Sequence, residues 1–149
     1  MICELSFSFL SCKDEYTICN LSKNVNFNAG FYQRISGADV SAQAPLFTLY
    51  LPGNGIQPIY SNQVNAKSFS LPLDPGRDST RYVISIGSGQ TDTLTIVYSS
   101  VSVTLSEPCG EVFNNNLIKV YSTANSLDSA RIVNRAVTTA GLENARIYF

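Results

Sequence analysis

Histidine and tryptophan are absent from the 149-residue chain, and charged residues make up only 14% of it. Without histidine, the chain lacks the commonest general base, the commonest transition-metal ligand and the usual partner of a catalytic serine or cysteine. Without tryptophan, it lacks the strongest stacking side chain for sugars, although eight tyrosines and eight phenylalanines are present. We therefore expect a protein that is not an enzyme and that uses no cofactor.

The charge balance argues against two further classes of function. Ten lysines and arginines stand against eleven acidic residues, the net charge is −1, and the basic residues are scattered along the chain. Nucleic-acid binding needs a concentrated basic footprint, and charge-driven membrane binding needs a basic patch. The sequence has neither, so we expect no nucleic-acid partner.

Residues 1–11 have the features of the end of a bacterial lipoprotein signal. The apolar run Ile2–Ser11 leads into Cys12, after which the sequence turns abruptly polar. In such signals a small residue before the cysteine admits the signal peptidase, and the cysteine is then acylated. No basic residue precedes the run and Glu4 lies within it, so we expect a truncated signal whose natural start lies upstream.

The same segment has an alternative interpretation as an N-terminal strand. Leu5, Phe7 and Phe9 alternate with polar residues and would then share one face. A transmembrane helix is excluded, because it needs about 20 apolar residues.

Four cysteines are present, at positions 3, 12, 19 and 109. If Cys3 belongs to the signal and Cys12 is acylated, Cys19 and Cys109 remain. In an exported protein such a pair most simply forms a disulfide, whereas in a cytosolic protein both would be buried thiols. No C-x-x-C spacing occurs, which disfavours a zinc site.

From residue 20 onward, short apolar runs alternate with turn signals. Val25, Phe27, Ala29 and Phe31 repeat with a period of two, which a helix cannot use. Predicted strands lie at 25–31, 46–51, 56–60, 67–73, 80–86, 92–98, 101–105, 117–121, 130–133 and 145–149. We predict one all-β domain over residues 12–149, with a short N-terminal tether. Its expected fold is an antiparallel β-sandwich of about seven to nine short strands, with a small β-barrel as the alternative.

Two segments remain ambiguous. The apolar phase slips at Ser99–Ser100, which indicates either a β-bulge or a tight turn. Residues 126–140 have some helical spacing, but their β-branched content favours strand plus loop.

Several motifs, taken together, resemble one family. They are Leu71–Thr80 (a PLDP…DST turn), Asp92–Tyr98 (a DTLTI-x-Y strand), Ser106–Gly110 (an SE-x-CG element), Ser129–Asn134 and the Ile147–Phe149 ending. In these five motifs the chain is similar to uncharacterised cell-envelope lipoproteins of Bacteroides-type bacteria, which form a family of unknown function. The resemblance implies a lipid-anchored β-domain outside the cytoplasm, with Cys12 as the anchor and Cys19 paired with Cys109. It implies no catalytic residue.

Other candidate sites are weak. Asp74 and Asp78 flank Pro75–Gly76 and are the only metal candidates, for calcium, but a calcium loop supplies more oxygen ligands, so a plain turn is favoured. Asp92, Glu107 and Glu111 carry no motif that would make any two of them a glycosidase pair. The Gly87-Ser88-Gly89 sequence lies between two predicted strands and indicates a hairpin, not a phosphate loop.

We predict a non-enzymatic cell-envelope lipoprotein that acts as a binding or assembly module. Its partners would be the outer membrane, through the lipid, and an unidentified protein or glycan on the periplasmic or surface face. The alternative is a glycan- or calcium-binding surface protein. In that case some of the eight tyrosines would form a sugar-stacking platform, although most alternate with core residues and are expected in the core or at an interface.

Overall fold

A computed structural model describes residues 18–53 and 57–149, and these residues form eleven strands. The strands are β1 (Asn26–Ile35), β2 (Ala38–Ser41), β3 (Ala44–Tyr50), β4 (Pro58–Ala66), β5 (Ser68–Pro72), β6 (Ser79–Ile86), β7 (Thr91–Ser106), β8 (Gly110–Ser122), β9 (Ser129–Ile132), β10 (Ala136–Val137) and β11 (Ala145–Tyr148). No helix in the described ranges has the length and apolar character of a membrane span. The predicted all-β class is confirmed.

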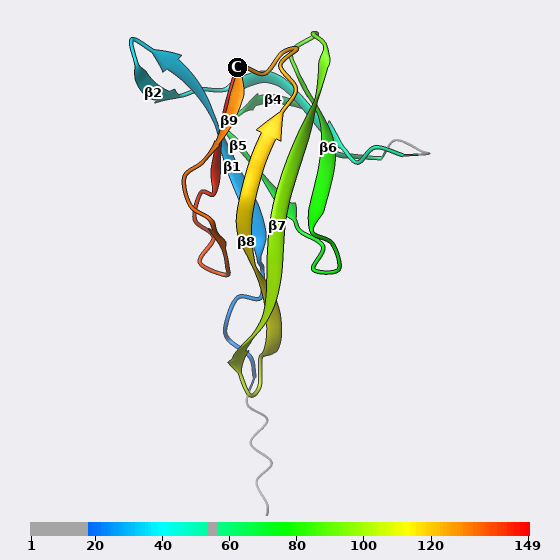
Figure 1. Cartoon of the computed structure of the whole chain (residues 1–149), viewed down its shortest axis with the longest axis vertical. Coiled ribbons are helices and arrows are strands. Elements are labelled where there is room, and N and C mark those ends of the chain that lie inside the picture. The colour runs from blue at the N-terminus through cyan, green and yellow to red at the C-terminus, as the bar shows by residue number, and fades with distance from the viewer. Residues whose placement is uncertain (1–17, 54–56) are drawn as a thin grey trace, which may run out of the picture.

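The strands form two sheets that pack as a sandwich (Figure 1). The first, sheet A, has the order β2-β1-β11-β9, with β5 also paired to β1. The second, sheet B, has the order β10-β8-β7-β6-β3-β4. The described strands therefore form a sandwich and not the closed barrel considered as the alternative. Most ladders are antiparallel, as predicted, but β1 and β11 pair in parallel.

The core lies between the inward faces of the two sheets. On β1, Phe27, Ala29 and Phe31 are almost fully buried, which confirms the alternation predicted for this strand. Phe31 packs edge-on against Phe47 of β3 with ring centroids 5.1 Å apart, so the two sheets meet through aromatic contacts. Burial of such side chains supplies the main stabilisation of a sandwich.

Both ambiguous segments are resolved. β7 runs unbroken through Ser99–Ser100, so the phase slip is not a tight turn. A β-bulge lies nearby, between Val97 and Tyr98, but its extra residue, Ile118, is on β8. The valine after the slip, Val101, is exposed and does not continue the core face of β7. Residues 126–140 contain the short strands β9 and β10 joined by loops, as the β-branched content predicted. The predicted strand at 56–60 is also an edge strand, β4, but it extends to Ala66.

The β7–β8 hairpin extends past the rest of the sandwich as a two-stranded ribbon (Figure 1). Cys109 lies in its turn and forms a disulfide with Cys19. The C-terminus lies at the opposite end of the long axis of the molecule (Figure 1). The disulfide therefore fixes the segment that precedes β1 to the ribbon tip.

Candidate functional site

The outer face of sheet A combines a hollow lined by polar side chains with a group of ion pairs. Alternate residues of β1 from Asn28 to Arg34 point outward, because the residues between them, such as Ala29 and Phe31, fill the core. β5 and β11 flank β1 on its two sides and add their own outward residues. This face holds a groove at one end and an ion-pair network at the other.

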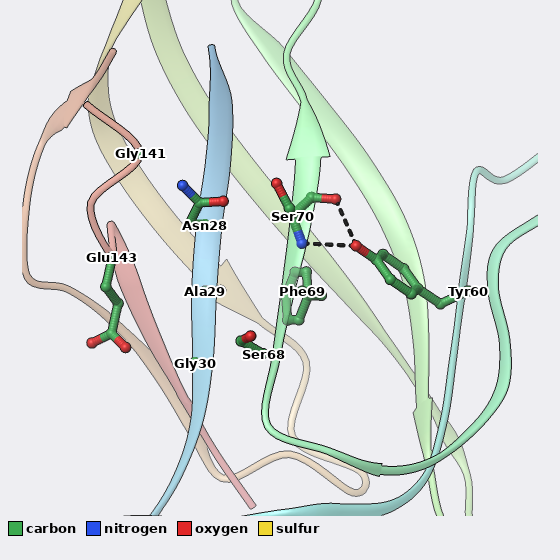
Figure 2. A pocket seen from close by; sticks show the side chains of 9 residues that line it. All are labelled: Asn28, Ala29, Gly30, Tyr60, Ser68, Phe69, Ser70, Gly141 and Glu143. Carbon is green, nitrogen blue, oxygen red and sulfur yellow. Dashed lines mark hydrogen bonds between the residues drawn. The ribbon is translucent and has the colours of Figure 1, made fainter. Parts of the chain in front are cut away.

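The groove has a volume of about 410 Å³. Its lining comes from β1, β4, β5 and the loop before β11, and consists of Asn28, Ala29, Gly30, Tyr60, Ser68, Phe69, Ser70, Gly141 and Glu143 (Figure 2). A second hollow of about 250 Å³ adjoins it and shares Asn28, Ser70 and Gly141. It adds Ser22, Asn24, Asn26 and Thr139. Both hollows carry hydroxyl and amide groups, which in the first lie beside the apolar surface of Ala29 and Phe69, and we call the two together the polar groove.

Tyr60 of β4 forms one wall of the polar groove. Its hydroxyl accepts the N–H of Ser70 at 2.9 Å and donates to the Ser70 carbonyl at 3.0 Å (Figure 2). Its ring packs against Phe47, with centroids 5.3 Å apart. These contacts hold the ring in place and satisfy backbone groups on the free edge of β5, which would otherwise be open to pairing with another chain.

Asn144 fixes the opposite wall, formed by the loop before β11. Its side chain is buried, accepts the Asn28 N–H at 3.0 Å and donates to the carbonyls of Asn134 and Ala136 at 3.1 and 2.9 Å. Its backbone N–H donates to the Asn28 carbonyl at 2.8 Å. Because Asn144 uses its full side-chain amide in this way, the position of the loop relative to β1 is set before any ligand arrives.

Glu143 places a carboxylate over the floor of the polar groove. The Tyr32 hydroxyl donates to it at 2.9 Å, and Arg146 Nε donates at 3.1 Å. Burial and the adjacent Glu143 carboxylate raise the pKa of Tyr32, so its hydroxyl stays protonated as a donor. Gly30 makes this arrangement possible, since a Cβ there would lie 2.6 Å from Glu143 Oε2 and 2.8 Å from Tyr32 Cε2.

Gly30→Ala is expected to lower the free energy of unfolding by about 1–2 kcal/mol, because the added methyl displaces both side chains from a packed arrangement. Urea unfolding would measure this. In a Glu143→Ala background the same substitution should cost clearly less, because the closest clash is gone. An equal cost in both backgrounds would show that Glu143 does not lie where the structure places it.

At the other end of this face, Asp39 of β2 forms ion pairs with three arginines. Its Oδ2 lies 2.7 Å from Arg131 Nη2 and 3.0 Å from Arg146 Nη1, and it accepts the Tyr148 hydroxyl at 2.9 Å. Arg34 Nε lies 3.6 Å from Oδ1. The Tyr148 hydrogen bond, together with the arginines, lowers the pKa of Asp39. Through Arg146 and Glu143 this network continues into the polar groove.

The structure brings together one of the predicted pairs of site residues. Cys19 and Cys109 are disulfide-bonded, as predicted. Cys12 and the signal segment 1–11, including the alternative strand there, lie outside the described residues.

Asp74 and Asp78 lie in a tightly hydrogen-bonded turn between β5 and β6. Asp74 Oδ1 accepts the Gly76 N–H at 2.8 Å, and its Oδ2 lies 3.4 Å from Arg77 Nε. Tyr98 of β7 donates its hydroxyl to the Asp74 carbonyl and its N–H to the Asp78 carbonyl. Within the described ranges, no three His, Cys, Asp or Glu side chains lie close enough together to hold a metal ion. Two of the sequence motifs, the PLDP…DST turn and the DTLTI-x-Y strand, thus meet in space.

Of the other acidic candidates, Asp92 and Glu111 have structural contacts, and Glu107 lies in the turn between β7 and β8. Asp92 is buried and accepts hydrogen bonds from the loop after β8. Glu111 accepts the Ser102 hydroxyl across the ribbon. The Gly87–Gly89 segment connects β6 and β7 as the predicted hairpin.

Sequence reasoning missed the polar groove and the Asp39 network. Their residues come from separate segments, and each alone is an ordinary surface serine, asparagine, aspartate or arginine. The only local signal is the outward alternation of Asn28, Gly30, Tyr32 and Arg34 on β1.

Comparisons with known proteins give one match. Residues 48–149 match the model of a family of unknown function, DUF6452. The match includes β4 to β11, and therefore Tyr60, Glu143, Asn144 and Cys109. No curated protein and no solved structure matches the chain. The chain belongs to the DUF6452 family.

Proposed function

We propose that the protein is a non-enzymatic binding module of the cell envelope, anchored by lipid on Cys12, with the polar groove as its binding site. The membrane is its first partner, through the acyl chains, and the outer membrane is the proposed location, on the periplasmic or surface face. The partner in the groove is a protein or a glycan.

The observation that carries this proposal is the Cys19–Cys109 disulfide at the ribbon tip. Disulfides persist in oxidising compartments outside the cytoplasm. Cys12 precedes Cys19 by seven residues, a span of at most about 25 Å even when extended. A lipid on Cys12 would therefore keep the ribbon tip close to the membrane. The Asp39 network, near the C-terminus, would lie at the far end of the long axis (Figure 1).

The contacts of the titratable groups support a binding role over catalysis. The chain has no histidine, and the carboxylates of Asp92 and Asp39 already accept hydrogen bonds or ion pairs. By contrast, the lining of the polar groove offers hydroxyl and amide groups that can pair with the polar groups of a ligand.

The alternative is a glycan- or calcium-binding surface protein. The calcium version has little support, because the Asp74 carboxylate already binds Gly76 and Arg77 within its turn. The glycan version is favoured by the hydroxyls and amides of the polar groove, which contains Tyr60 as an aromatic wall.

When the complete gene is expressed in a related bacterial host, intact-mass spectrometry should find acyl chains on Cys12. Cys12→Ser should abolish the modification and move the protein from the membrane to the soluble fraction, because stable anchoring depends on the lipid. Cys3→Ser should still yield the acylated product, since that residue would be removed with the signal. An unmodified Cys12 in membrane-free protein would overturn the anchoring proposal.

A further inference from the structure

We propose that the polar groove binds an uncharged oligosaccharide, extended along the outer face of β1. This inference rests on the proposed function in one respect, namely that the groove is the binding site of the module. It does not depend on the lipid anchor.

The hydrogen-bonding groups of the lining match sugar hydroxyls. Ser68 and Ser70 point their hydroxyls into the groove, and neither hydroxyl has a hydrogen-bond partner among the described residues (Figure 2). Asn28 adds a side-chain amide whose single contact, to the Leu142 carbonyl, is long at 3.4 Å. Sugar hydroxyls both donate and accept, so they pair with serine hydroxyls and asparagine amides alike.

Glu143 provides the strongest acceptor in the groove. Tyr32 and Arg146 orient its carboxylate, but two carboxylate oxygens have about four acceptor positions, so capacity remains for two neighbouring sugar hydroxyls. Among the residues that the structure describes, no lysine or arginine lines either hollow. The one cation beside Glu143 is Arg146, which is already paired with the carboxylate at 3.1 Å and does not line the hollows. The groove therefore presents an acceptor and no free cation, which favours an uncharged ligand over a uronate or phosphate.

Tyr60 provides an apolar surface. Its ring is only half-buried and lines the groove while its hydroxyl is bound to Ser70. The C–H face of a sugar ring can pack against such an aromatic wall.

The elongated shape of the polar groove indicates that its ligand is an oligosaccharide and not a single sugar. The two hollows adjoin at Asn28 and Ser70, and the second continues along β1 toward Asn24 and Asn26. The first hollow, of about 410 Å³, lies in the size range of ligand sites, and the second, of about 250 Å³, extends it into an elongated site.

Both walls are fixed in advance. The double hydrogen bond of Tyr60 to Ser70 holds one, and the buried Asn144 side chain holds the other. Preorganisation lowers the entropic cost of binding, which is important for a weak, polar ligand.

The experiment uses the full chain without acylation and an array of bacterial and plant cell-wall glycans, both neutral and uronate-containing. The best neutral hit is then titrated by two-dimensional amide NMR. We expect at least one neutral oligosaccharide to bind, with shifts confined to residues near β1, β5 and the loop before β11. The corresponding uronate-containing chain should bind at least tenfold more weakly.

Two variants with matched controls locate the site. Ser68→Trp fills the groove from an exposed position and should weaken binding at least tenfold, whereas Ser99→Trp, on an exposed position of β7 in sheet B, should not. Glu143→Gln should weaken binding roughly fivefold or more, whereas Glu111→Gln on the ribbon should not. Circular dichroism melting would show that each variant is folded.

The outcomes separate this inference from the anchoring proposal. No neutral hit on the array, or a hit whose affinity Ser68→Trp leaves unchanged, would overturn the glycan inference even if Cys12 is acylated. Tighter binding of uronates than of neutral chains would also overturn it. Groove-specific binding together with an unmodified Cys12 would instead retain the glycan site and remove the anchor.

Discussion

Replacement of Asp92 by alanine is expected to lower the free energy of unfolding by about 3–5 kcal/mol. The Asp92 side chain is buried, and its Oδ2 accepts the N–H groups of Ser126 and Leu127 at 2.7 and 2.9 Å. Its Oδ1 accepts the Asn125 N–H and the Thr123 hydroxyl, each at 2.7 Å. One carboxylate thus holds the loop that leads from β8 to β9.

The large effect follows from what the substitution leaves behind. Three backbone N–H groups lose their acceptor, and each donor left unsatisfied in a buried site costs roughly 1–3 kcal/mol. Asp92→Asn should lie between alanine and the wild type, because its single amide oxygen can replace only part of the acceptor capacity. Urea unfolding followed by circular dichroism would measure the differences. Asp128→Ala, at an exposed position in the same loop, should stay within about 0.5 kcal/mol of wild type.

The contribution of Asp92 also has a defined pH dependence. Burial alone would raise its pKa, but the hydrogen bonds from Asn125, Thr123, Leu127 and Ser126 outweigh burial and hold the pKa below its usual value. Asp92 therefore stabilises the fold fully above the pKa of an unfolded aspartate, about 4, and this stabilisation is lost as the pH falls through the lower folded pKa. The difference between wild type and Asp92→Ala should shrink on acidification below about pH 4. A difference that stays constant down to pH 2 would contradict the proposed cause.

The strands were predictable because their signals are local. The alternation at Phe27, Ala29 and Phe31 reflects one buried and one exposed face. Pro58 lies on the edge strand β4, where proline is tolerated because it cannot donate to a ladder. Pairing between strands was not predictable in the same way. The parallel β1–β11 ladder joins residues far apart in the sequence, and no local pattern in either strand identifies its partner.

The candidate site was not predictable for the same reason: its contacts join residues that are far apart in the sequence. Asn28 and Asn144 lie 116 positions apart and meet only because β1 and β11 are neighbours. Asp92 looked like an ordinary strand start, since its partners at residues 123–127 become neighbours only after β7 and β8 pair. The Cys19–Cys109 pair was predictable without geometry, because the count of cysteines and the family resemblance left few partners.

Removal of the disulfide by a Cys19→Ser, Cys109→Ser double substitution is expected to cost about 2–5 kcal/mol. The bond joins residues 90 positions apart, and for a loop of that length the chain-entropy model gives about 4–5 kcal/mol, the upper part of this range. A reductant should have the same effect on the wild type, by attack on the Cys19 sulfur, because Cys19 is only half-buried whereas Cys109 is 2% exposed. It should have no effect on the double variant, which serves as its control.

The position of the disulfide predicts which residues lose local stability when it is removed. The ribbon tip extends past the core, so the disulfide is its main tie to the segment before β1, which contributes Ser22 and Asn24 to the polar groove. Amide hydrogen exchange should therefore speed up in residues 20–25 and 106–114 and stay slow around Asn144, whose hydrogen bonds do not involve the ribbon. Uniform acceleration across both sheets would mean that the disulfide supports the whole sandwich. Unchanged exchange at the tip would mean that other contacts hold this end of the groove, so that the disulfide is not what ties the N-terminal tether to the ribbon.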